Sequence, residues 1–175
     1  MNELRVLDVQ SSEIVELKLA SCPKLRTINL SQTDSLEKIT FTRTLGELEE
    51  FRLENAFITE LDLSSCPQLR SIYLRQNKEL KTITFPHVLD NLENFSLITS
   101  SVTELTLPSC PQLKNLNLSF TRNLEKITFS GPMNNLKKIE LFGSATKEII
   151  GTNFCPSLDI SNISKDIKLI QTNGS

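Results

Sequence analysis

The chain has 175 residues, a formal net charge of −2 and 38% apolar residues, a length that suits one domain with its own core. The near-neutral charge, without a basic block, argues against binding of nucleic acid, and no apolar run reaches the roughly 18–20 residues of a membrane span. One His, no Trp and five Gly leave little material for a metal site, a catalytic triad or a phosphate loop, so we expect no metal, no cofactor and no enzyme activity. The excess residues are leucine, with 28 copies, and isoleucine, with 15, and they require a periodic explanation.

Short apolar-x-apolar pairs recur along the whole chain and predict its strands. The pairs are Leu7/Val9, Leu17/Leu19, Ile28/Leu30, Ile39/Phe41, Phe51/Leu53, Leu61/Leu63, Ile72/Leu74, Ile83/Phe85, Phe95/Leu97, Leu105/Leu107, Leu116/Leu118, Ile127/Phe129 and Ile139/Leu141. From Leu17 onward the steps are 11, 11, 12 and 10 residues, and then they repeat. Alternation with a period of two residues indicates short strands, and the links between them are too short for helices of normal length.

A longer period of 44 residues relates three copies of a Ser-Cys-Pro-x-Leu segment. These begin at Ser21, Ser65 and Ser109, and they define units near 14–57, 58–101 and 102–145. Short strands that recur without hairpin turns stack as the coils of a solenoid, here with about 22 residues and two strands per coil. Alternate pairs then form two parallel sheets with their apolar residues inward. Sheet A is expected to contain Leu17, Ile39, Leu61, Ile83, Leu105 and Ile127, and sheet B Leu7, Ile28, Phe51, Ile72, Phe95, Leu116 and Ile139.

At this level the sequence resembles the leucine-rich repeat family. Residues 69–77 read as L-x-x-L-x-L-x-x-N, and the Leu-Asp-Leu-Ser-Ser-Cys-Pro segment at 61–67 is similar to bacterial variants with nested spacings of 10–12 residues. The resemblance implies an all-β-rich repeat solenoid over 1–158, a right-handed coil with parallel sheets on two sides and little helix. Residues 146–175 are then a degenerate last repeat with a C-terminal cap or tail. The family is a scaffold for many ligands, so the resemblance names no partner.

The family's asparagine ladder is only partly present. Asn77 occupies the ladder position once, and the equivalent positions hold Ser12, Thr33, Ala56, Ser100, Thr121 and Ser144. We expect the hydroxyl residues among them to hydrogen-bond the turn backbone more weakly than asparagine does.

The cysteines and the histidine have both chemical and structural interpretations. Cys22, Cys66 and Cys110 share one register, with Cys155 close to it, and two coils separate neighbours by about 10 Å, beyond the reach of a disulfide. No ligand pair at zinc spacing accompanies them, so we expect a column of buried free thiols. We expect His87 to be a surface-loop residue, since a catalytic histidine would need a nucleophile and an orienting carboxylate.

Phenylalanines also recur at one repeat position. Phe41, Phe85 and Phe129 are 44 residues apart and could suggest a ligand box, but packing in the core between coils is the favoured interpretation.

A binding surface is expected on sheet B, because its outward row varies from coil to coil. That row is Asp8, Asn29, Arg52, Tyr73, Ser96, Asn117 and Glu140, whereas the row on sheet A is rich in threonine. Arginine and tyrosine are enriched at interface hot spots. The candidate binding residues are Arg52, Arg70, Tyr73, Arg75, Ser96 and Asn117, with a protein as the expected partner. The alternatives are an ordinary solvated face, and a structural or spacer role as a segment of a bacterial cell-surface adhesin.

The repeats start at Leu4, so the first coil is expected to be uncapped and to promote end-to-end self-association. The first residues lack the apolar core of a signal peptide, and buried free cysteines favour a reducing compartment. The compartment is otherwise unassigned: the cysteines favour the cytoplasm, and the cell surface is the alternative if the chain is part of a longer protein.

Overall fold

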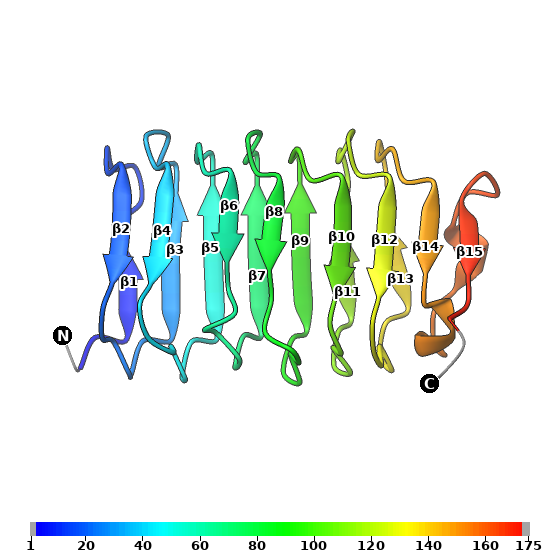
Figure 1. The fold of residues 1–175 in the computed structure, drawn as a ribbon, viewed down its shortest axis with the longest axis horizontal. Helices are drawn as coiled ribbons and strands as arrows, with labels where there is room; N and C mark the ends of the chain where they lie inside the picture. The colour runs from blue at the N-terminus through cyan, green and yellow to red at the C-terminus, as the bar shows by residue number, and fades with distance from the viewer. Residues whose placement is uncertain (1–2, 173–175) are drawn as a thin grey trace.

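The computed structural model describes residues 3–172 as a parallel β-solenoid of about eight coils with about 22 residues per turn (Figure 1). Strands stand side by side in two layers along the whole length of the molecule, and the described ends of the chain lie at opposite ends of the stack. The only helices in the described part are two short 3-10 turns, η1 (Thr152–Phe154) and η2 (Ile160–Asn162). No helix there is long and apolar enough to cross a membrane. The predicted solenoid is therefore confirmed.

Sheet B is one continuous parallel sheet in the order β1-β3-β5-β7-β9-β11-β13. Its strands are β1 (Val6–Asp8), β3 (Thr27–Ser31), β5 (Glu50–Glu54), β7 (Ser71–Arg75), β9 (Asn94–Ile98), β11 (Asn115–Asn117) and β13 (Lys138–Glu140). The predicted inward column is in register from strand to strand: Leu7, Ile28, Phe51, Ile72, Phe95, Leu116 and Ile139. The sequence spacing therefore predicted every neighbour in this sheet.

The opposite side was predicted as one sheet, and this was wrong. Its strands are β2 (Glu16–Leu19), β4 (Lys38–Phe41), β6 (Glu60–Asp62), β8 (Thr82–Thr84), β10 (Glu104–Leu107), β12 (Lys126–Phe129), β14 (Glu148–Ile150) and β15 (Lys168–Ile170). They form three sheets, β2-β4, β6-β8 and β10-β12-β14-β15.

Both breaks fall where a coil is divided into steps of 12 and 10 residues. The paired strands β2/β4, β6/β8 and β10/β12 are separated by two steps of 11 residues, whereas β4/β6 and β8/β10 span the unequal division. The β12/β14 junction has the unequal division and remains paired, so the step pattern alone does not break the ladder.

The core consists of inward columns, with aromatic pairs between the two sides. Phe41 packs edge-to-face on Phe51 with ring centroids 6.3 Å apart, and Phe85 packs on Phe95 at 5.7 Å. Each pair joins a strand to the next one along the chain, and the third copy replaces the second ring with Ile139. The recurring phenylalanines are therefore core residues, as predicted, although Phe41 and Phe85 stay partly exposed while Phe129 is fully buried.

Left-handed turns follow the sheet B strands. The six non-glycine residues with positive φ are Ser11, Gln32, Asn55, Gln76, Thr99 and Phe120, with φ of 52–59°. Gly143, at φ 68°, continues the series. The left-handed region costs an L-residue about 1–2 kcal/mol, so the fold imposes this conformation on residues that do not favour it.

Side chains of the ladder position stabilise these turns unevenly. The buried Asn77 side chain donates to the Leu53 carbonyl and accepts from the Ala56 N–H, both at 3.0 Å. Thr33 and Thr121 each donate to a carbonyl three residues earlier, at 2.8 and 2.6 Å. The buried hydroxyls of Ser12 and Ser100 have no partner among residues 3–172. The expectation that the hydroxyl residues bond the turn backbone is therefore confirmed at the threonines and wrong at these two serines.

The two ends of the solenoid differ. In the first coil most inward residues are only half-buried, whereas four of their counterparts one coil later, Leu25, Ile28, Leu30 and Leu36, are fully buried. The half-buried set is Leu4, Leu7, Val9, Ile14 and Leu17. β1 pairs only with β3, and β2 only with β4. At the other end, η2 lies where the next strand of sheet B would begin, and the segment after it returns as β15. Residues 173–175 of the predicted cap or tail lie outside the described residues.

Replacing Asn77 with alanine should lower the free energy of unfolding by about 2–4 kcal/mol, because two buried backbone groups lose their partners at about 1–3 kcal/mol each. Urea denaturation followed by circular dichroism measures the change. Asn29→Ala is the matched control, since Asn29 lies on the outward face of sheet B. Equal stability of the two variants would contradict a structural role for the Asn77 side chain.

We propose that the first coil associates with the first coil of another copy, because within residues 3–172 β1 and β2 are each paired along one edge alone. Val6, 56% exposed on the edge strand, is the residue to change. Light scattering coupled to size-exclusion chromatography should show a mass that rises with concentration, and Val6→Lys should suppress this rise, since lysine blocks edge pairing. Val88→Lys adds the same charge elsewhere and should not. A wild-type monomer at every concentration would contradict the proposal.

Candidate functional site

Four of the six candidate binding residues form one row across sheet B. Arg52 lies beside Tyr73, Tyr73 beside Ser96, and Ser96 beside Asn117, on the successive strands β5, β7, β9 and β11. All four project from the face opposite the buried column, because inward and outward residues alternate along each strand. The sequence therefore correctly predicted which residues share this surface, at the spacing of neighbouring strands, about 4.8 Å.

Arg52 and Tyr73 form the centre of the row. The guanidinium carbon of Arg52 lies 4.4 Å from the centroid of the Tyr73 ring, and its Nε donates to the Glu50 carboxylate on the same strand. Stacking of a guanidinium on an aromatic ring is worth about 0.5–1 kcal/mol at an exposed site. The two side chains are thus held in a defined arrangement before any ligand arrives, which lowers the entropy lost on binding.

Arg75 ends β7 two residues after Tyr73 and therefore faces the same side. It is exposed, its neighbours in register are Glu54 and Ile98, and it forms no ion pair within residues 3–172. Arg75 is consequently the cation of this group whose charge is available to a partner.

Arg70 stands apart from the row, in a ladder of alternating charges that runs along the edge where the sheet B strands begin. Its Nε is 3.8 Å from Glu49 and its Nη1 is 3.6 Å from Glu93. Arg26 extends the ladder at 2.9 Å from Glu49, and Lys114 does so at 2.6 Å from Glu93. The hydrogen bond and charge of Lys114, with a smaller effect of Arg70, lower the pKa of the Glu93 carboxyl. Arg70 is therefore already paired within the chain.

The far end of the row is also tied to its own sheet. Asn117 donates from Nδ2 to Glu140 at 2.7 Å and accepts from the Ser119 N–H at 3.0 Å. On the adjacent row, Asn115 donates to Asn94, which in turn donates to Ser71. Ser96 lies between Tyr73 and Asn117 and is half-buried. The side chains of Asn94, Asn115 and Asn117 are therefore already hydrogen-bonded within the sheet.

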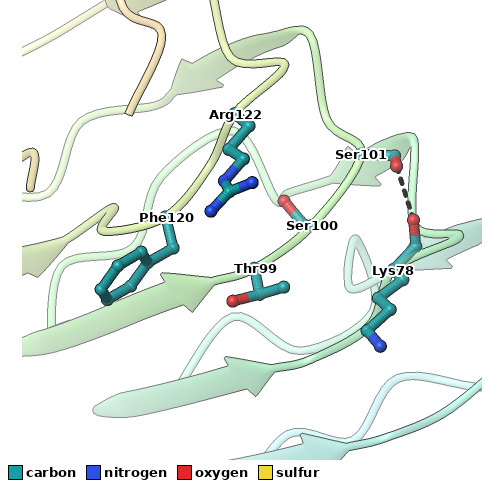
Figure 2. Close-up of a pocket in the computed structure, with 6 residues that line it drawn as sticks. All are labelled: Lys78, Thr99, Ser100, Ser101, Phe120 and Arg122. Carbon is teal, nitrogen blue, oxygen red and sulfur yellow. Dashed lines mark hydrogen bonds between the residues drawn. The ribbon is translucent and has the colours of Figure 1, made fainter. Parts of the chain in front are cut away.

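A second surface feature was missed in the sequence. Hollows follow one another along the edge where the sheet B strands end, and we call this line the edge groove. The lining of one hollow includes Asp34, Asn55, Phe57 and Lys78. The lining of the next includes Lys78, Ser100, Phe120 and Arg122 (Figure 2). The lining of a third includes Phe142, Ser144 and Asp166.

The edge groove contains the exposed phenylalanines of the described chain. Phe57 is 57% exposed, Phe142 is 74% exposed, and Phe120 packs edge-to-face on Phe142 with ring centroids 5.2 Å apart. A signal for them was present in the 44-residue alignment, where Phe120 replaces Gln76 and Phe142 replaces Ile98. The apolar pattern that predicts the strands depends on inward positions, so an outward phenylalanine leaves that pattern unchanged.

The large pKa shifts among residues 3–172 belong to buried thiols. Burial raises the pKa of the Cys66, Cys110 and Cys155 thiols to about 12, with the charge of Asp62 adding to the effect at Cys66 and that of Asp90 at Cys110. His87 is exposed, as predicted. Within residues 3–172 no group of three or more His, Cys, Asp or Glu residues is placed to hold a metal ion. All four cysteines are free and buried, which confirms the predicted thiol column.

The four thiols should be unreactive until the protein unfolds, because all are buried and the thiolate, which is the nucleophile, is further disfavoured by the raised pKa of Cys66, Cys110 and Cys155. Ellman's reagent at pH 8 should label the native protein slowly and label four thiols in urea. Val88→Cys, at an exposed position, provides a control that reacts at once. Rapid labelling of a natural cysteine in the native protein would contradict the buried column.

No protein-family model matches the chain, and no curated protein or solved structure has significant similarity to it. Its function is therefore inferred from the residues and geometry described above.

Proposed function

We propose that this chain is a non-catalytic protein-binding module, built on a solenoid that resembles leucine-rich repeats, and that its sheet B face contacts the partner. The observation that carries the proposal is the row from Arg52 to Asn117, which presents different side chains at equivalent positions of successive coils. Stability of the repeat does not require that variation, since threonine fills many equivalent positions on the opposite side.

The stacked Arg52–Tyr73 pair and the unpaired Arg75 are the proposed centre of contact. Arginine and tyrosine bury large areas and make directional hydrogen bonds, which explains their enrichment at hot spots. Mixed charge around them, with Glu50 and Glu54 on the same strand as Arg52 and beside β7, favours a protein over a polyanion. Arg70 contributes less, because a partner must compete with Glu49 and Glu93 for its guanidinium.

A spacer or adhesin role is the rival proposal. The repetition of Thr40, Thr84 and Thr128 at one position supports it, since a uniform β surface is what an extended structural element needs. A spacer would tolerate changes on either face alike, whereas a binding module would be sensitive on one face only.

The test compares two triple variants after a partner has been isolated by cross-linking and identified by mass spectrometry. Arg52→Ala, Tyr73→Ala and Arg75→Ala together should weaken binding at least about 30-fold, the equivalent of a 2 kcal/mol hot spot. The control replaces Thr40, Thr84 and Thr128 with alanine and should leave the dissociation constant unchanged. Arg70→Ala alone should have a smaller effect. Equal binding by both triple variants would remove sheet B from the proposal and favour the spacer role.

A further inference from the structure

One hollow of the edge groove combines features that point to a ligand. It has a volume of about 290 Å³ and is lined by Lys78, Thr99, Ser100, Ser101, Phe120 and Arg122 (Figure 2). These residues come from the turns that follow three adjacent strands, β7, β9 and β11. Thr99 and Phe120 are two of the residues held in the left-handed conformation, so the turns that shape the hollow are strained.

Ser100 lies beneath the surface of this hollow and lacks a hydrogen-bond partner. The side chain is 7% exposed, and its Oγ has no partner among residues 3–172. The equivalent serine two coils later, Ser144, is hydrogen-bonded to the Thr121 hydroxyl, with the two oxygens 3.0 Å apart. Buried hydroxyls are almost always hydrogen-bonded, because leaving one unpaired costs about 1–3 kcal/mol. The free structure therefore leaves a polar group that a bound molecule can satisfy.

Two cations flank Ser100, and their charges are not neutralised by neighbours. Lys78 and Arg122 are each 22 residues from Ser100, which places their backbones one coil to either side, about 10 Å apart. Neither forms an ion pair within residues 3–172, and none of the residues that line the hollow is acidic. Most other basic residues of sheet B and its borders are paired, as Arg26, Arg52 and Arg70 are.

The two cations differ in how they meet the hollow. In Figure 2 the oxygen of Ser100 is turned to the side on which Arg122 lies, while the amino group of Lys78 extends away from Ser100. Lys78 also lines the neighbouring hollow with Phe57 and Glu79. Its backbone carbonyl accepts from Ser101 Oγ at 2.5 Å, which fixes the turn while leaving the flexible side chain free to swing.

The charge at this repeat position changes along the groove. Residues 44 apart are Asp34, Lys78 and Arg122, so the charge changes from negative to positive along the groove, and Asp166 lines the hollow beyond Arg122. A ligand along the groove would thus meet a positive centre, with an exposed aromatic ring on either side at Phe57 and Phe142. A negative charge on the ligand at that positive centre would make the two surfaces electrostatically complementary.

We propose that this hollow binds an anionic group, a carboxylate or a phosphate, carried by an extended segment of a protein partner. The guanidinium of Arg122 pairs with the anion in bidentate geometry, and the Ser100 hydroxyl donates to it after a rotation about the Cα–Cβ bond. Lys78 adds a second charge from the other side, and Phe120 packs against the carbon atoms that carry the anion. The site shares no residue with the sheet B row, so its failure and that of the proposed function are separate results.

The experiment is an NMR titration of the uniformly labelled full chain with acetate, inorganic phosphate and phenyl phosphate at constant ionic strength. We expect saturable shifts at the amides of Ser100, Ser101 and Arg122, and tighter binding of phenyl phosphate than of inorganic phosphate through the Phe120 contact. Preference for acetate would identify an acidic side chain as the source, and preference for phosphate a phosphorylated one.

Two of the variants introduce the residue that occurs at the equivalent position 44 residues earlier. Ser100→Ala matches Ala56 and Phe120→Gln matches Gln76, so both should fold like the wild type, as circular dichroism verifies. Arg122→Gln should raise the dissociation constant about tenfold, Lys78→Gln less, and Ser100→Ala about fivefold. Arg43→Gln removes an exposed cation elsewhere and should change nothing.

Several results would overturn the proposal. Shifts that never saturate, or that spread equally to Arg43, would mean non-specific attraction of anions to basic residues. Unchanged affinity of the Arg122→Gln variant for the anion would exclude Arg122 as the cation that pairs with it. Unchanged affinity in Ser100→Ala would mean that water, not the ligand, satisfies the buried hydroxyl.

Discussion

The parallel hydrogen bonding between successive coils is the constraint on which the rest of this structure depends. Each strand of sheet B bonds to the strand one coil away, in register, so residues at equivalent repeat positions lie directly beside one another. A residue type that recurs at one repeat position therefore forms a column along the molecule. The buried leucines, the thiols and the outward row are all columns of this kind.

In-register stacking also limits which charges can follow one another. Like charges on adjacent strands repel, and opposite charges attract weakly at an exposed site. The ladder of Arg26, Glu49, Arg70, Glu93 and Lys114 obeys this rule by alternating sign at every coil. Side-chain amides achieve the same result without charge, as Asn115 and Asn94 do. Much of the polar surface beside sheet B is thus occupied by contacts within the chain, which makes Arg75, Lys78 and Arg122, three cations of this region without an ion pair among residues 3–172, the informative ones.

The turns show where the repeat is under strain. A left-handed residue is needed after each strand of sheet B from β1 to β13, and glycine supplies it only at Gly143. Elsewhere the packed core and some ladder residues hold the turn, as Asn77 does through its two hydrogen bonds to the backbone on either side of Asn55. The conformational free energy that these left-handed residues cost is concentrated along the edge groove. Outward phenylalanines and a buried unpaired hydroxyl occur at the same edge. Departures from the repeat therefore gather on one edge of an otherwise regular molecule.

The sequence by itself determined the coil length, the strand positions and the neighbours of each residue in sheet B, because hydrophobic periodicity with a fixed step admits few other arrangements. It also determined that Arg52, Tyr73, Ser96 and Asn117 share a row. Only the tertiary structure decided that the opposite side divides into three sheets, since the paired β12/β14 junction has the same spacing as the two breaks. It alone decided that Arg70 is paired and Arg75 is not, and that Ser100 lies beneath a hollow between two cations, because ion pairs, side-chain direction and buried hydrogen bonds depend on three-dimensional distances that spacing does not encode.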